Sequence, residues 1–300
     1  MSGRPVARRS RAPLPARQRR SVKRASAGLS AVRAAAALAM LVSAAAIYGV
    51  GASPAFQYAR LQLDGVRFTD PTAVEEAVAD ARGKNLFLVA TKPLETSLEG
   101  MHTIERAWVD VRLPGTLAVT IEERQPVLIW QVGSHRFLTD AQGMLFAEVA
   151  DQNVAAAAGL PVIDDRRLAS TGTPGSDEPR SAAAGLGIGS QLDPIDLDAA
   201  TRLASLEPAD VGSSAVSLAV VVTDANGFVL DARPNGWTAV FGFYTMSLRS
   251  TEIIAGQVRL LRSLVIGREP LVERVILASE TDGTYTPRET APGTKPSKAP

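Results

Sequence analysis

The chain has 300 residues, of which 46% are hydrophobic and 21% are charged, so it is long enough for one or two domains with ordinary cores. It has no cysteine, which excludes a disulfide framework and a cysteine nucleophile. The formal net charge of +1 hides an asymmetry, because no acidic residue precedes Asp64, whereas 31 acidic and 21 basic residues lie from there onward. A basic arm before an acidic body indicates either nucleic-acid contact or membrane topology.

An uncharged run follows the basic arm. As a helix, residues 34–52 would reach roughly 28 Å, close to the ~30 Å hydrocarbon core of a bilayer. Nine of these positions are alanine, so insertion depends on the larger apolar side chains, which are Leu38, Met40, Leu41, Val42, Ile47 and Val50. Tyr48 suits the membrane–water interface. We therefore predict one transmembrane helix over residues 34–53, with membrane lipid as its partner.

The basic residues before this run predict its orientation, because positively charged flanks stay in the cytoplasm. Residues 1–33 are expected to form a basic cytoplasmic tail, and everything after Ser53 is expected to be extracytoplasmic. The topogenic residues named by this prediction are Arg17, Arg19, Arg20, Lys23, Arg24 and Arg33. A cleaved signal peptide, with Val50-Gly51-Ala52 as a cleavage-like site, and a buried soluble helix are the alternatives. Basic tails beside membrane helices are usually only topogenic, so nucleic acid is not expected as a partner.

Residues 58–126 predict one small α+β module. A short strand covers residues 61–66, and a helix begins at Pro71 with Asp70 as its N-cap and stops at Gly83. A second short helix carries apolar residues on one face, namely Leu94, Leu98 and Met101. The expected order is strand–helix–helix–strand–strand, with two helices covering one face of a three-stranded sheet.

The last two strands of this module give the clearest pattern. Val109 and Val111 alternate with Asp110 and Arg112, and the same period of two continues after the turn through Leu117, Val119 and Ile121. This alternation predicts a hairpin with one buried and one solvated face. Pro114 would set φ for the turn, and Gly115 would take the positive φ that follows.

Residues 127–285 are expected to form a mainly antiparallel β domain with one or two helices. The predicted strands cover residues 127–132, 136–139, 215–222, 227–232, 237–241 and 272–278, and the last of them is expected to be an edge. A helix is predicted near residues 195–206 and another over an apolar stripe ending at Val265. Residues 164–191, rich in Gly, Ser and Pro, predict a flexible insertion that begins with the loop acids Asp164 and Asp165. Residues 286–300 predict a disordered tail.

The sequence offers no catalytic constellation. His102 and His135 lie in different modules without the spacing of metal ligands or of a triad. The glycines at 185–189 lack the preceding strand and following helix of a phosphate-binding loop. Glu122 and Glu123 would point to opposite faces of one strand. We therefore predict no enzyme activity, no catalytic residue, no cofactor, no metal and no small-molecule substrate.

Four motifs occur in order over about 66 residues: Leu63-Asp-Gly65, Gly83-Lys-Asn-Leu-Phe87, Ile104-Glu-Arg-Ala-Trp-Val109 and Glu123-Arg-Gln-Pro126. In this order and spacing, after a single membrane helix, they resemble the POTRA domain of the FtsQ/DivIB type of cell-division protein. Two further stretches, Asp140–Phe146 and Gly159-Leu-Pro161, resemble the elements that follow POTRA in that family.

The resemblance implies a non-catalytic, single-pass scaffold of the bacterial divisome. It would lie in the cytoplasmic (inner) membrane at the division septum and recruit or regulate other division proteins through edge-strand and surface contacts. In the family, small coiled-coil proteins, FtsB and FtsL, dock at the C-terminal edge of the β domain. Carried onto this chain, the docking residues are Val272, Arg274, Ile276 and Tyr285.

Two departures from the family pattern lie near this edge. The strand reads Val275-Ile-Leu-Ala-Ser279 where the family has an Asp-Leu-Arg core, and Gln257 stands where Lys is common. POTRA modules also serve export and outer-membrane assembly, usually as repeats before a membrane barrel, whereas one copy is found here. An export or assembly factor and an extracytoplasmic wall-binding protein therefore remain the alternative functions.

Overall fold

The computed structural model describes residues 30–151, 153–167, 185–234, 236–246 and 249–288. The chain divides into two units, Met1–Ala52 and Ser53–Pro300. Of the predicted topogenic residues, only Arg33 lies within the described part, and the other five lie outside it.

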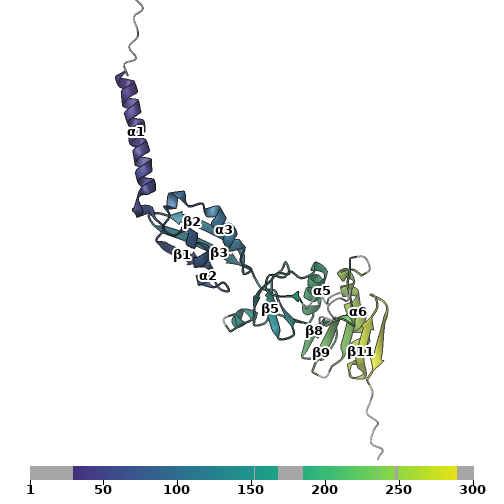
Figure 1. The fold of residues 1–300 in the computed structure, drawn as a ribbon. Coiled ribbons are helices and arrows are strands. Elements are labelled where there is room, and N and C mark those ends of the chain that lie inside the picture. Colours follow the sequence, from purple (N-terminus) through teal and green to yellow (C-terminus); the bar gives the residue numbers. More distant parts are fainter. Residues whose placement is uncertain (1–29, 152, 168–184, 235, 247–248, 289–300) are drawn as a thin grey trace, which may run out of the picture. The chain divides into compact units, whose positions relative to one another are not determined.

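The first unit contains one long helix, α1 (Ala31–Ala52), drawn in purple in Figure 1. Among the described residues it is the one helix long and apolar enough to cross a membrane. None of its side chains is buried by protein, so the predicted membrane-facing residues are all exposed on it. The helix begins before the predicted run and includes Arg33. A membrane anchor is the function that this helix indicates.

The second unit begins with the predicted α+β module. Its sheet has the order β1–β3–β2, with β3 parallel to β1 and antiparallel to β2. The elements are β1 (Arg60–Asp64), α2 (Pro71–Ala77), α3 (Thr91–Glu99), β2 (Ile104–Arg112) and β3 (Thr116–Glu123), with short 3-10 turns η1 (Pro54–Phe56), η2 (Ala79–Ala81) and η3 (Leu86–Leu88). Asp70 caps α2 as predicted, because its carboxylate accepts the Thr72 N–H at 2.9 Å. The predicted order of strands and helices is confirmed.

The hairpin between β2 and β3 has the predicted buried face, on which Val109, Val119 and Ile121 lie in the core. Its turn differs from the prediction, because Gly115 is not among the glycines with positive φ and the Leu113–Pro114 peptide is cis. A close approach of the backbone favours glycine there instead. A Cβ on Gly115 would lie 3.1 Å from the carbonyl oxygen of Gln57.

The rest of the unit is built on one nine-stranded sheet of order β12–β11–β10–β9–β8–β7–β4–β5–β6. Five of its eight pairings are antiparallel, so the prediction of a mainly antiparallel β domain is confirmed. The strands are β4 (Leu128–Val132), β5 (His135–Thr139), β6 (Leu145–Glu148), β7 (Val162–Asp165), β8 (Ser217–Thr223), β9 (Gly227–Arg233), β10 (Thr238–Gly242), β11 (Val272–Leu277) and β12 (Gly283–Pro287). The helices are α4 (Val154–Ala157), α5 (Pro194–Ala204) and α6 (Ile254–Val265), with 3-10 turns η5 (Thr251–Ile253) and η6 (Glu269–Leu271).

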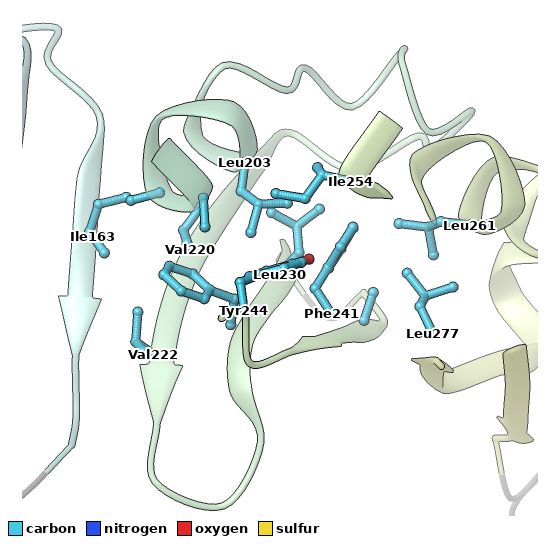
Figure 2. Close-up of a cluster of buried hydrophobic side chains, with 14 of the residues drawn as sticks. Ile163, Leu203, Val220, Val222, Leu230, Phe241, Tyr244, Ile254, Leu261 and Leu277 are labelled. Atoms are coloured by element: carbon cyan, nitrogen blue, oxygen red, sulfur yellow. The ribbon is translucent and has the colours of Figure 1, made fainter. Parts of the chain in front are cut away.

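The main core lies between this sheet and the two longer helices, α5 and α6. Figure 2 shows Leu203, Ile254 and Leu261 from the helices packing against side chains of the strands. All three are almost completely buried, and burial of an apolar side chain of this size contributes about 1.5–3 kcal/mol. A smaller cluster around Ile129 and Phe146 packs separately from this core and includes the half-buried Phe68.

The expectation that Asp164 and Asp165 are loop acids is wrong. Both belong to β7, which lies between β4 and β8 and is parallel to each. Asp165 is buried and accepts hydrogen bonds from Trp130 Nε1 at 3.2 Å and Arg167 Nη2 at 2.7 Å. Arg167 also reaches Asp196 at the start of α5, at 2.7 Å. The predicted insertion therefore begins too early; residues 168–184 lie outside the described part of the chain.

We predict that Asp165→Asn destabilises the β domain by about 3 kcal/mol, because it removes the buried carboxylate that Arg167 contacts and leaves this partly buried charge only its pair with Asp196. The matched control is Asp164→Asn, which removes only the more exposed pair with Arg166 and should cost less than about 1 kcal/mol. Chemical unfolding of the full chain in detergent, followed by tryptophan fluorescence, measures both. Equal losses for the two variants would contradict the structural role of Asp165.

Candidate protein-interaction edge

The strand predicted as the final edge is not the edge of the sheet. β11 is parallel to β10 on one side and antiparallel to β12 on the other. Residues 286 and 287, predicted to begin a disordered tail, belong to β12. β12 reads Gly-Thr-Tyr-Thr-Pro, which lacks the apolar alternation by which a strand with one buried face is recognised. The edge strand on this side is therefore β12.

The four predicted docking residues lie in different environments. Val272 is fully buried in the main core, so its prediction as a contact residue is corrected. Arg274 is half-buried and donates from Nη2 to Asn226 Oδ1 at 2.7 Å. Ile276 is 42% exposed and Tyr285 is 46% exposed. Ile276 pairs with Thr284, one residue away from Tyr285, so the two exposed side chains lie on opposite faces of the sheet.

Backbone hydrogen bonds show which side of β12 is already used. Ala278 N donates to Asp282 O at 2.9 Å, and Arg288 N donates to Leu271 O at 2.8 Å. Because bonding in an antiparallel pair alternates along the strand, the backbone groups of the even-numbered residues between 282 and 288 face β11.

The odd-numbered residues of β12 direct their backbone groups away from the sheet. Gly283 and Tyr285 each turn an N–H and a C=O outward, and Pro287 has no N–H to offer. A second strand could therefore pair with a short window centred on Tyr285.

Two other sheet edges in the described part of the chain, β6 and β2, have hydrogen-bond partners on their outer sides. Along β6, Leu145 N donates to Ser190 O at 2.9 Å, and Gly189 N donates to Leu145 O at 2.8 Å, so residues 189–190 occupy that edge. Along β2, Val109 N donates to Glu95 Oε1 of α3 at 3.2 Å. This N–H, together with Lys92, holds the pKa of Glu95 below its ordinary value. Among the described residues, these contacts leave β12 as the open end of the nine-stranded sheet.

Glu269 positions the segment that leads into β11. Its carboxylate accepts hydrogen bonds from Ser213 Oγ, from Ser214 N at 2.8 Å and from Trp237 Nε1 at 3.0 Å. Burial alone would raise the pKa of Glu269, but these donors outweigh burial and hold the pKa below its ordinary value. The ionised carboxylate therefore fixes the chain directly before β11.

Gln257 of α6 holds the other end of β11. Its side chain is fully buried, and Nε2 donates to Leu277 O at 3.0 Å and to Phe241 O at 3.3 Å. Its Oε1 accepts the Tyr244 hydroxyl at 2.8 Å. The neutral amide of Gln257 donates to both carbonyl groups and accepts from the tyrosine hydroxyl. A lysine here would bury a positive charge, which costs free energy, and would offer no acceptor to the hydroxyl. The departure from the family pattern thus has a physical basis.

The residues considered for catalysis have structural partners. His135 pairs with Glu148 at 2.8 Å, and the ring of His102 lies against Gly189. Glu123 is buried and accepts the N–H groups of residues 67–69 at 2.8–2.9 Å, while Glu122 is exposed. In the described part of the chain, no group of three or more His, Cys, Asp or Glu side chains could hold a metal ion.

The fold defines a POTRA-type module followed by a β domain, and comparison with known proteins agrees. Residues 56–124 match the family model "POTRA domain, FtsQ-type". The chain is 25% identical over 240 residues to the cell division protein FtsQ of Chloroflexus aurantiacus, covering 80% of this chain and 73% of that protein. It is 28% identical over 167 residues to FtsQ of Chloroflexus aggregans, covering 56% and 54%.

The cell division protein FtsQ of Rickettsia bellii matches over 97 residues at 25% identity, which is 32% of this chain. The chain therefore spans only 36% of that relative's length. The resemblance carried by the four sequence motifs is confirmed: residues 56–124 match the FtsQ-type POTRA domain, and the chain is similar to cell division proteins FtsQ.

We predict that Glu269→Gln lowers the unfolding temperature at pH 7 and that this difference disappears in acid. Because the folded-state pKa is lowered, the stabilisation is complete above the unfolded-state pKa of about 4.3 and is lost as pH falls through the folded value. The control is Glu273→Gln, exposed on β11. Thermal unfolding between neutral and acidic pH measures both; a difference for Glu269→Gln that persists at the lowest pH would contradict the argument.

Proposed function

We propose that the chain is a non-catalytic, membrane-anchored scaffold of the bacterial divisome. The observation that carries the proposal is the open edge of β12 in a protein related to cell division proteins FtsQ. Exposed edges bind extended peptides through main-chain hydrogen bonds, and neighbouring side chains supply specificity. Recruitment or regulation of other division proteins through this edge requires no catalytic group.

The proposed topology places residues 1–33 in the cytoplasm, the membrane span at residues 34–53 and the later domains outside. Excess Lys and Arg before α1 supports this orientation. On this proposal residues 58–126 form the POTRA domain and residues 127–285 the β domain, and the helix anchors both in the inner membrane at the division septum. The structure adds residues 286–287 to the β domain.

The proposed partners are small coiled-coil division proteins that resemble FtsB and FtsL. One of their extended segments would pair with the outward groups of Gly283 and Tyr285. Ile276 would contact it from one face of the sheet and Tyr285 from the other. Arg274, already bonded to Asn226, would set the charge beside Ile276. Val272, the first residue of β11, stays in the core and anchors the start of that strand.

We predict that Tyr285→Pro weakens partner capture about tenfold or more, because proline removes an outward N–H and its ring blocks the approaching strand. Its N–H does not face β11, so the sheet should persist. Tyr285→Phe is the matched control and should retain capture. Co-purification with the division proteins and imaging of a fluorescent fusion on the N-terminus measure binding and septal recruitment.

Capture that is unchanged in Tyr285→Pro and in Ile276→Glu would move the binding site away from β12. A uniform membrane signal of the unaltered fusion throughout division would contradict the division role. The export or assembly factor and the wall-binding protein would then be the better functions.

A further inference from the structure

Apolar side chains gather at one end of the POTRA module, and the division-protein edge does not use them. Phe56 and Phe87 are in edge-to-face contact, with ring centroids 5.3 Å apart. Phe87 is 53% exposed, Leu88 is 74% exposed and Leu113 is 51% exposed. We call Phe56, Phe87, Leu88 and Leu113 the POTRA lip. Exposed apolar groups that gather in one place indicate an interaction site.

The backbone holds the lip in this exposed arrangement. Asn85 is buried, and its side chain caps η3 by accepting the Phe87 N–H at 3.0 Å. Tyr58 N donates to Lys84 O at 3.0 Å, which ties the start of this loop to the chain beside Phe56. Leu86 enters the core, whereas the two residues that follow it, Phe87 and Leu88, are exposed. These hydrogen bonds and the burial of Leu86 therefore fix Phe87 and Leu88 in exposed positions.

The hairpin turn brings Leu113 to the same end of the module. Gly115 O accepts the N–H groups of Ala59 and Arg60 at 2.9 and 3.1 Å, and Arg60 lies opposite Thr116 in the sheet. The chain segment that follows Phe56 and the turn that carries Leu113 are thus bonded to each other.

Three basic side chains lie close to the lip along the chain. Arg60, Lys84 and Arg112 are exposed, and each lies within a few residues of a lip residue. Exposed apolar side chains with basic neighbours suit the surface of a bilayer that contains anionic lipid. The basic residues therefore favour an anionic lipid surface over an uncharged protein surface as the partner of the lip.

The sequence also limits how far the lip can lie from the membrane. α1 ends at Ala52, and only Ser53, Pro54 and Ala55 separate it from Phe56. Four residue steps reach at most about 14 Å, even fully extended. If α1 spans a bilayer, Phe56 must therefore stay near the headgroup layer.

We propose that the POTRA lip inserts into the interfacial layer of the membrane, with Arg60, Lys84 and Arg112 on anionic headgroups. The inference rests on the membrane anchor of the proposed function. Insertion would fix the orientation of the POTRA module on the bilayer and would add a second, reversible contact to the single helix.

A single-cysteine label tests the lip, because the chain contains no cysteine of its own. Leu88→Cys, carrying a nitrobenzoxadiazole group, is reconstituted as the full chain in phosphatidylcholine vesicles with and without phosphatidylglycerol. Nitroxide lipids labelled near the headgroup should quench it at least about twofold more than the same label at Met246→Cys, which is 92% exposed on the β domain. Quenching should increase with phosphatidylglycerol and decrease in high salt.

A second label position tests whether the quenching depends on the lip as a whole. With the label at Leu113→Cys, the change Phe87→Ser together with Leu88→Ser should reduce quenching to the level of the Met246→Cys control. Both serines replace exposed side chains, so Leu86 and Asn85 still hold the loop.

Flotation of the vesicles separates the two hypotheses. If the chain floats with the vesicles but the Leu88→Cys label is quenched no more than the Met246→Cys label, the lip does not contact lipid and a protein partner must cover it. If the chain does not float, the membrane anchor and the lip proposal both fail.

Discussion

The β domain depends on a four-residue strand, β7, which joins its two halves. β4, β5 and β6 lie on one side of it, and β8 to β12 lie on the other. Asp165 at the end of this strand is buried, so its carboxylate needs a partner of opposite charge. Arg167 supplies the charge, Trp130 supplies a further donor, and Asp196 links the group to α5. These contacts stabilise the strand through which the two halves form one continuous sheet.

Control of strand edges is the second constraint, because every open edge can pair with another chain. Residues 189–190 bond to β6, and the carboxylate of Glu95 occupies an N–H of β2. β12 has no such partner among the described residues, but it is only five residues long, and Pro287 lacks the N–H that would otherwise point outward. An edge with a brief, defined window favours one short peptide over uncontrolled association, which agrees with the proposed role in partner capture.

The POTRA module was predictable because its signals are local. The cap at Asp70 and the alternation through β2 and β3 act over a few residues. β7 was not predicted because two adjacent acidic residues are typical of a loop. The contact of Asp165 with Arg167, which makes its burial possible, forms only in the folded chain. Val272 was misplaced because a bulge between Val272 and Arg274 reverses the alternation and turns Val272 into the core. A register shift of this kind depends on the partner strand β12, which the sequence pattern did not reveal.

Recognition through backbone groups also bears on how far the sequence can diverge while the proposed function persists. Main-chain pairing at Gly283 and Tyr285 needs a strand in the right place more than a particular side chain. Glu269 and Gln257 position β11 through hydrogen bonds and do not belong to the β12 edge. Such residues can differ between relatives if other groups replace their hydrogen bonds. An identity of 25% over 240 residues is therefore compatible with a retained edge, whereas a catalytic site would have required the same reacting groups in the same geometry.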